Sequence, residues 1–209
     1  MFGDGSLTFR EFAMRERVPL AAIHDAVLEF LRGRGDAALF GAQAVNAYVD
    51  QPRMTQDVDI LSTRAKELAE ELRRFLQERF QMAVRVRAVA GGLGYRVYQA
   101  RKPTHRHLAD VRKVERLPAC KRLRKVLILM PAELIAHKVL SMTGRPKTPK
   151  GFLDAADLRR LLLRFPELKA DLGPVATSLQ GLAASAQAFE AWQALVAEEI
   201  LPEDEDAGF

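Results

Sequence analysis

The chain has 209 residues, of which 48% are hydrophobic and 28% are charged, a balance typical of a globular protein with one sizeable core. It contains no apolar run near the roughly 18 residues that span a bilayer, and its start lacks the basic and apolar regions of a signal peptide. Its one cysteine, Cys120, cannot form an internal disulfide, so we expect a reducing, cytoplasmic setting and no membrane partner.

The net charge of +5 is distributed unevenly along the chain. Residues 101–150 hold 14 Lys or Arg against three acids, a net charge of +11, which leaves −6 for all other residues. A stretch this basic favours a polyanionic partner. The alternative is a basic surface that only keeps the protein in solution.

The first part of the chain predicts two helices and one strand. Residues 1–18 have weak periodicity, which indicates a helical arm or a loop. Apolar residues recur at helical spacing over 19–31, so we expect an amphipathic helix there. A strand over 37–40 then turns into a short helix over 41–48, which a following proline ends.

The middle of the chain predicts a second strand, a charged helix and a β-hairpin. A strand over 57–61 is followed by a helix over 62–80, capped by a Ser-Thr pair. Residues 82–89 and 94–100 alternate as two strands around a glycine turn. The cluster Gly91-Gly-Leu-Gly94 precedes a strand rather than a helix, so it is not a dinucleotide-binding fingerprint.

The last part of the chain predicts two more strands and then helices. Residues 201–209 form an acidic tail that we expect to be disordered. The predicted elements before that tail are strands over 107–114 and 125–130, helices over 132–142 and 152–165, and further helical structure up to residue 200.

Two acids lie in the predicted strand over 57–61. Asp57 and Asp59 are separated by one residue, so a regular strand points both carboxylates to one face. Two like charges on one face need a cation, and Mg²⁺ bound by carboxylate oxygens suits phosphate chemistry. The alternative is a pair of solvent-exposed acids at a strand edge.

The glycine turn before these acids predicts a phosphate site. Gly41 stands at the join between strand and helix, where it lets a backbone approach closely. The first helical turn, which begins with Gly41 and Ala42, offers free N–H groups to a phosphate. Taken alone, Gly41 could be an ordinary turn glycine. Taken with the acid pair at this spacing, it favours a unit that binds metal and phosphate.

A third acid, Asp110, interrupts an otherwise apolar strand. If that strand lies beside the strand of Asp57 and Asp59, three carboxylates converge on one metal site. His105 and His107 fall on the opposite face from Asp110 if the strand is regular, which excludes them from that site.

The helix over 132–142 carries Lys138 beside its apolar stripe. A lysine at such an edge either extends its ammonium group to water or binds a phosphate. The next helix carries Asp154 and Asp157 on one face, three residues apart.

In this order, Gly41-Ala42, Thr55, Asp57-Val-Asp59 and Asp110 resemble the polymerase-beta-like nucleotidyltransferase superfamily. A later set looks like its AbiEii/MenA-type branch, which contains toxins of bacterial toxin–antitoxin and phage-defence systems. The likeness covers about residues 37–165. One departure is Ala42, where the family usually has Gly or Ser, so the backbone N–H remains but no hydroxyl is present. The later set comprises Glu133-Leu-Ile-Ala-His-Lys138, Arg145, Lys150 and Asp154-Ala-Ala-Asp157-Leu.

The resemblance implies an α/β (α+β) fold. A minimal nucleotidyltransferase core over 1–130, with an N-terminal helical arm, would contain a mixed β-sheet flanked by helices. A helical C-terminal part over 131–200 would complete the site, and 201–209 would be the tail.

The resemblance also implies a reaction, the transfer of NMP from an NTP to an acceptor. Asp57 and Asp59 would hold two Mg²⁺ ions, and Asp110 would bind the ion that activates the acceptor hydroxyl for in-line attack. The residues implied to bind nucleotide are Gly41, Ala42, Thr55 and Lys138, and Asp154 or Asp157 would position Lys138 or the acceptor.

Three functions remain open. The first is a toxin that transfers a nucleotide to RNA, with the acceptor end of tRNA as the favoured target and a cognate antitoxin as a partner. The second is a small-molecule nucleotidyltransferase, such as one that modifies an aminoglycoside. The third is a non-catalytic protein that binds nucleotides or nucleic acid. Aminoglycosides are polycations that need acidic walls, so the basic stretch favours RNA, and the intact carboxylate trio favours an enzyme.

Overall fold

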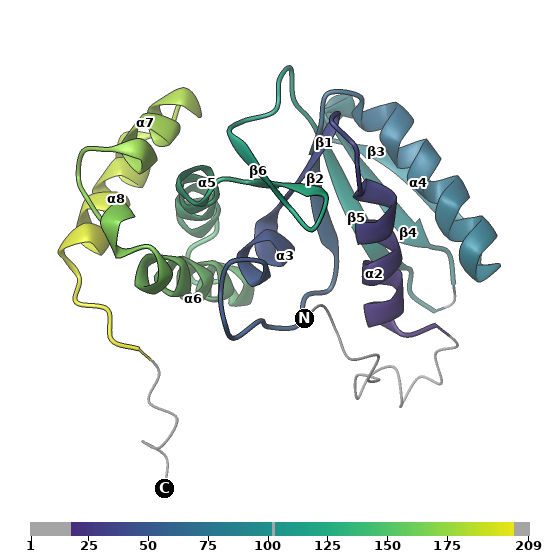
Figure 1. The fold of residues 1–209 in the computed structure, drawn as a ribbon, viewed down its shortest axis with the longest axis horizontal. Coiled ribbons are helices and arrows are strands. Elements are labelled where there is room, and N and C mark those ends of the chain that lie inside the picture. Colours follow the sequence, from purple (N-terminus) through teal and green to yellow (C-terminus); the bar gives the residue numbers. More distant parts are fainter. Residues whose placement is uncertain (1–17, 102, 203–209) are drawn as a thin grey trace, which may run out of the picture. The chain divides into compact units, whose positions relative to one another are not determined.

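The computed structural model describes residues 18–101 and 103–202 (Figure 1). The predicted N-terminal arm and most of the predicted acidic tail lie outside them. The described residues form two compact units, one of residues 18–43 and 53–129 and the other of residues 44–52 and 130–202. Residues 44–52, which the sequence places in the N-terminal core, therefore group with the C-terminal residues.

The first unit contains a seven-stranded β-sheet in the order β3-β4-β5-β2-β1-β7-β6. Strand β1 pairs in parallel with β7, and β2 pairs in parallel with β5, while the other neighbours are antiparallel. This sheet and its helices confirm the expected α/β class with a mixed sheet. The strands are β1 (Ala37–Phe40), β2 (Val58–Ser62), β3 (Val84–Val89), β4 (Gly94–Gln99), β5 (Arg106–Lys113), β6 (Cys120–Leu123) and β7 (Val126–Leu129).

In the first unit, helix α2 (Leu20–Leu31) packs against α4 (Ala65–Phe80), and α4 packs against β3, β4 and β5 (Figure 1). The short helix α3 (Gly41–Asn46) begins in this unit and continues into the second. In the second unit α5 packs against three other helices. No helix among the described residues is long and apolar enough to cross a membrane. The helices of the second unit are α5 (Pro131–Gly144), α6 (Pro149–Arg164), α7 (Pro174–Gly181) and α8 (Ala186–Ala197).

Residues that pair laterally on neighbouring strands form rows across the sheet, and two adjacent rows differ: one is apolar and the other is charged. Successive residues of a strand point to opposite faces, so the two rows lie on opposite faces of the sheet. The apolar row lies on the face that α4 covers with its buried leucines. The apolar row runs from β3 to β2 through Val86, Val97, Ala109 and Val58. The charged row on the other face runs through Arg87, Arg96, Asp110 and Asp59.

Two local expectations were wrong, and one strand was missed. Asp57 lies in the bend before β2 rather than in the strand. The N-cap of α4 is Arg64, which makes no side-chain cap; the Ser62 hydroxyl donates to the Asp36 carbonyl at 2.8 Å and accepts the backbone N–H of Arg64 at 3.0 Å, just before the helix begins. Strand β6 was not predicted, because its sequence Cys-Lys-Arg-Leu does not alternate and it pairs only with β7 at the sheet edge.

Candidate active site

Asp59 and Asp110 lie side by side on the parallel strands β2 and β5. Directly paired residues of neighbouring strands point to the same face, so both carboxylates belong to the charged row. Asp57 lies two residues before Asp59, and all three acids are partly exposed. The structure therefore brings Asp59 and Asp110 together through strand pairing that no local pattern specifies.

Gly41 lies directly against Asp59. A Cβ atom built on Gly41 would overlap Oδ2 of the Asp59 carboxylate. The backbone of Gly41 also has φ +69°, a conformation that favours glycine. Gly41 is therefore more than an ordinary turn glycine, because the position of the Asp59 carboxylate depends on its missing side chain.

Arg96 on β4 holds Asp110 with two hydrogen bonds. Its Nε donates to Oδ1 at 2.8 Å and its Nη2 donates to Oδ2 at 3.0 Å. The pKa of Arg96 is raised, chiefly by the hydrogen bond to Asp110 and also by the negative charges of Asp110, Asp57 and Asp59. The negative charges of all three predicted acids therefore act on one guanidinium group, although only Asp110 is hydrogen-bonded to it.

Arg96 was missed by sequence reasoning. The expected cation between the acids was Mg²⁺, whereas the chain supplies one of its own. The signal for Arg96 lies in the pairing of β4 with β5, which sets Arg96 opposite Asp110. That register includes a β-bulge, so counting residues around the loop does not give it.

The acids fit Mg²⁺ by the chemistry of their donors, since carboxylate oxygens are the ligands that this ion prefers. Asp57 and Asp59 offer such oxygens at the start of β2, while both oxygens of Asp110 are hydrogen-bonded to Arg96. Within the described residues, no group of three or more His, Cys, Asp or Glu side chains has the geometry of a metal site. A metal ion that recruits Asp110 beside Asp57 and Asp59 would therefore compete with Arg96 for its oxygens.

Thr55 takes part in a buried polar cluster. Nε2 of Gln43 donates to Oγ1 of Thr55 at 2.8 Å and lies 3.0 Å from Nδ1 of His24. All three side chains are buried, and they connect α2, α3 and the loop before β2. Gln43 and His24 were not singled out from the sequence. The cluster fixes the loop that leads to Asp57, so Thr55 acts on the shape of the site even without touching a nucleotide.

In the second unit, Lys138 lies in a buried cluster of charges. Its Nζ donates to Oδ1 of Asp154 at 2.9 Å and to Oδ2 of Asp157 at 2.6 Å. The Lys138 side chain is only 6% exposed, so its ammonium group does not extend to water. Arg145 holds the other oxygen of Asp154. The structure thus brings together the lysine and both acids that the sequence grouped.

The strand-parity argument about His107 was wrong, because β5 is not regular. The register between β4 and β5 shifts between Val97 and Tyr98, so that Tyr98 pairs with His107. Tyr98 lies two residues after Arg96 and shares its face. His107 is therefore on the face of Asp110 rather than on the opposite one, although it is two rungs away from the acids.

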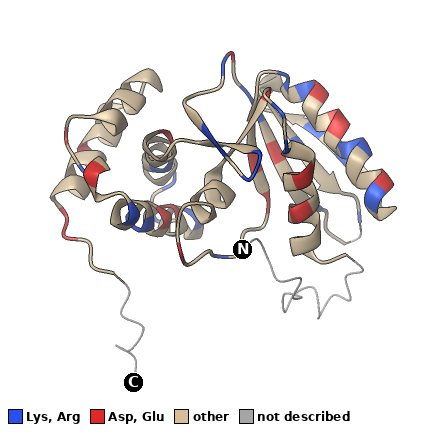
Figure 2. Cartoon of the chain, viewed as in Figure 1, with Lys and Arg blue, Asp and Glu red and all other residues tan. Residues whose placement is uncertain are grey.

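The basic stretch 101–150 is divided between the two units, since residues up to 129 belong to the first and later ones to the second. In the first unit, four of its basic residues lie on the β6–β7 hairpin, namely Lys121, Arg122, Arg124 and Lys125 (Figure 2). Arg122 there donates to the carbonyls of Lys125 at 2.9 Å and Arg34 at 3.1 Å. This guanidinium therefore stabilises the hairpin as well as carrying surface charge.

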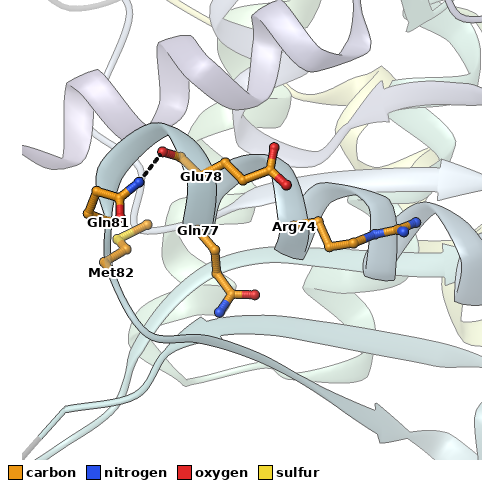
Figure 3. A pocket seen from close by; sticks show the side chains of 5 residues that line it. All are labelled: Arg74, Gln77, Glu78, Gln81 and Met82. Atoms are coloured by element: carbon orange, nitrogen blue, oxygen red, sulfur yellow. Dashed lines mark hydrogen bonds between the residues drawn. The ribbon is translucent and has the colours of Figure 1, made fainter.

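A hollow on the surface of the first unit lies at the C-terminal end of α4 (Figure 3). The side chain of Gln81, which is one of its lining residues, donates to the Glu78 carbonyl at 2.8 Å. Helix α4 packs on the apolar face of the sheet, so this hollow does not belong to the acid site. Its lining residues are Arg74, Gln77, Glu78, Gln81 and Met82.

Known proteins resemble this chain in structure but not detectably in sequence. No protein-family model matches the chain, and no curated protein matches it by sequence. A putative nucleotidyltransferase from H. pylori is similar with a TM-score of 0.53 and 13% identity, over 91% of this chain and 93% of that one. ANT(2″)-Ia in complex with adenylyl-2″-tobramycin is similar with a TM-score of 0.51 and 12% identity, over 85% of this chain and 100% of that one.

The Megavirus polyadenylate synthase is similar with a TM-score of 0.55 and 14% identity, over 70% of this chain. The aligned part is 32% of the synthase, so the chain spans about a third of that protein. Likenesses at such low identity establish the fold and not the reaction. We conclude that this chain has the fold of these nucleotidyltransferases.

Proposed function

We propose that this protein is a metal-dependent nucleotidyltransferase that transfers NMP from an NTP to RNA. The observation that carries the proposal is the lateral pairing of Asp59 with Asp110 on neighbouring strands, with Asp57 two residues before Asp59, in a chain with the fold of known nucleotidyltransferases. Three partly exposed acids at one end of a strand pair repel one another. Arg96 supplies one positive charge against their three negative ones, and a divalent cation bound by the acids would offset the rest.

The metal would be held first by Asp57 and Asp59. When bound, Mg²⁺ would neutralise charge on the triphosphate and on the attacking and leaving oxygens of an in-line displacement. The missing side chain of Gly41 keeps Asp59 in place, and the buried Gln43–Thr55 hydrogen bond fixes the loop before Asp57. These residues prepare the site before any ligand arrives.

The reaction joins an acceptor hydroxyl oxygen to the α-phosphorus of the NTP. The bond between that phosphorus and the bridging oxygen breaks, pyrophosphate leaves, and the hydroxyl proton is released. Asp110 is the acid that we assign to the acceptor side, with Arg96 orienting its carboxylate. Lys138 remains our predicted triphosphate ligand, and since two of its three N–H groups donate to Asp154 and Asp157, one is left for a phosphate.

RNA is the acceptor that charge favours. Exposed Lys and Arg lie on the same unit as the three acids, and they suit a polyanion better than an aminoglycoside, which is a polycation. We further propose that the protein acts as a toxin of a toxin–antitoxin or phage-defence system, with tRNA as target and a cognate antitoxin as partner. The support for this role is the sequence resemblance of residues 133–157.

The test is incubation of the purified protein with each labelled NTP and bulk tRNA, with and without Mg²⁺. We expect label in the RNA only with Mg²⁺, and none with Asp59→Asn. Label in an added aminoglycoside but not in RNA would favour the small-molecule enzyme, to which the fold likeness with ANT(2″)-Ia gives some support. No transfer with any NTP would refute the enzyme and leave a binding protein. Growth arrest on induction of the native chain, but not of Asp59→Asn, would support the toxin role.

A further inference from the structure

The face of the sheet that α4 leaves uncovered extends from the acids to the edge strand β3. The charged row ends there at Arg87. A second row on the same face joins Arg85, Tyr98 and His107, since Arg85 pairs with Tyr98 and Tyr98 pairs with His107. We name the surface formed by Arg85, Arg87, Tyr98 and His107 the β3–β4 platform.

The platform presents positive charge that the protein itself does not use. Arg85, Arg87 and His107 are exposed, and Tyr98 is partly buried. Within the described part of the chain, neither Arg85 nor Arg87 makes a side-chain hydrogen bond or an ion pair. Arg96, by contrast, is held by Asp110. Arg85 and Arg87 are therefore free to bind an external anion.

Beside its charge, the platform has the aromatic ring of Tyr98, with His105 next to it. The ring of Tyr98 lies 5.0 Å from that of His105, with 49° between the ring planes. Aromatic side chains on an open basic sheet stack with unpaired bases, while neighbouring arginines neutralise phosphates. The bases of a double helix are stacked on one another and cannot use such rings. The chemistry therefore suits a single strand.

We propose that the β3–β4 platform binds the single-stranded end of an RNA acceptor, whose terminal hydroxyl points along the charged row toward Asp110 and Asp59. Three strand spacings of about 4.8 Å set the backbone of Arg87 roughly 14 Å from that of Asp59. The direction toward the acids rests on the proposed function, but the binding itself does not. The main RNA contact thus moves to Arg85 and Arg87, outside the basic stretch 101–150.

Charged residues on an edge strand have a second use, which is to prevent pairing with the edge of another sheet. Replacing both arginines by glutamate separates the two roles. Arg85→Glu with Arg87→Glu keeps the edge strand charged, so protection against edge pairing is retained, but the new carboxylates repel phosphate. A loss of RNA binding in this variant therefore reports the phosphate contacts and not a change in edge protection.

The experiment measures binding of a fluorescent single-stranded oligoribonucleotide by anisotropy at several salt concentrations. The test variant is Arg85→Glu with Arg87→Glu. The matched control is Lys66→Glu with Arg74→Glu, which makes the same change in net charge at exposed positions of α4 on the other side of the sheet. Thermal unfolding checks that each variant is folded, and Arg85→Gln with Arg87→Gln replaces the test variant if it is not.

We expect the test variant to raise Kd at least about tenfold and to reduce the slope of log K against log salt by about 1.4, from two phosphate contacts. The control should leave both nearly unchanged. Tyr98→Ala should raise Kd about tenfold, whereas Tyr98→Phe, which keeps the ring, should not. Equal losses in test and control variants would overturn the platform, as would unaltered binding in the test variant or no RNA binding by the native protein.

The transfer assay separates this inference from the proposed function. If the native protein binds RNA through the platform but transfers no nucleotide, the function fails and the platform stands. If it transfers nucleotide to RNA while test and control variants bind alike, the function stands and the platform fails.

Discussion

The guanidinium of Arg96 on β4 holds both carboxylate oxygens of Asp110 on β5, at 2.8 and 3.0 Å. Asp110 is also the lateral neighbour of Asp59. The acids that we propose as metal ligands therefore already have a cation in the protein alone, and a metal ion that recruits Asp110 must compete with Arg96.

Removing that cation should make the fold depend more on the metal. In Arg96→Met the three acids lose their shared counter-charge, so the unfolding temperature in EDTA should fall, and millimolar Mg²⁺ should raise it more than it does in the native protein. Arg87→Met, in the same row, is the matched control. Equal Mg²⁺-induced shifts in the native protein and in Arg96→Met would contradict the competition.

The acids of the charged row should differ in their effect on stability. Both Asp59→Asn and Asp110→Asn should abolish transfer. Asp59→Asn removes one of several repelling charges, so its free energy of unfolding should be unchanged or higher. Asp110→Asn leaves Arg96 without its partner and should cost about 1 kcal/mol, because both side chains are partly exposed. Denaturant unfolding measures the difference, and full turnover in Asp59→Asn would refute the mechanism.

Gly41→Ala should disrupt the acid site through a direct clash. Gly33→Ala is the control, because Gly33 has a similar φ of +77° but open space around it. We expect Gly33→Ala to cost about 1 kcal/mol and to retain transfer. Gly41→Ala should cost more and lose transfer, since its Cβ would overlap the Asp59 carboxylate. Adding Asp59→Ala should restore part of that stability, and strictly additive losses in the double-mutant cycle would disprove the clash.

Lys138→Met should destabilise the second unit by about 3–5 kcal/mol, because it removes the buried ammonium group that donates to both Asp154 and Asp157. Arg145 also donates to Asp154, so most of the loss should come from the hydrogen bond between Lys138 and Asp157. Adding Asp157→Asn should therefore recover part of the stability. A loss below about 1 kcal/mol in Lys138→Met would show that the cluster is not a structural ion pair. NTP affinity, measured on the same variants, tests the phosphate role separately.

Asp36 should make stability depend on pH. Its pKa is lowered in the folded protein, chiefly by the hydrogen bond from Arg34 and also by the charges of Arg34 and Arg64. The stabilisation is thus complete above the pKa of the unfolded chain and is lost as pH falls through the lower folded pKa. Asp36→Asn should therefore cost stability at neutral pH and little in acid. The exposed Asp50→Asn serves as control, and a pH-independent cost of Asp36→Asn would contradict the linkage.

The sequence alone determined the local features of this protein. Periodicity located α2, α4, α5 and α6, and the alternation of apolar and charged residues gave the β3–β4 hairpin. The spacing of Gly41, Asp57 and Asp59 indicated a site, because these residues lie within one strand–turn–helix–strand unit. Helical spacing grouped Asp154 with Asp157, since three residues make nearly one turn.

Only the tertiary structure decided what faces those residues. Arg96 reaches Asp110 across a strand pair with a bulge, and the same bulge reverses the face of His107. Gly41 excludes a side chain because Asp59 comes from a neighbouring strand. Lys138 is buried because α6 brings two acids to it. Each of these contacts joins residues that are distant in sequence. Strand register and helix packing across a whole unit bring such residues together, and no short window of the sequence encodes either.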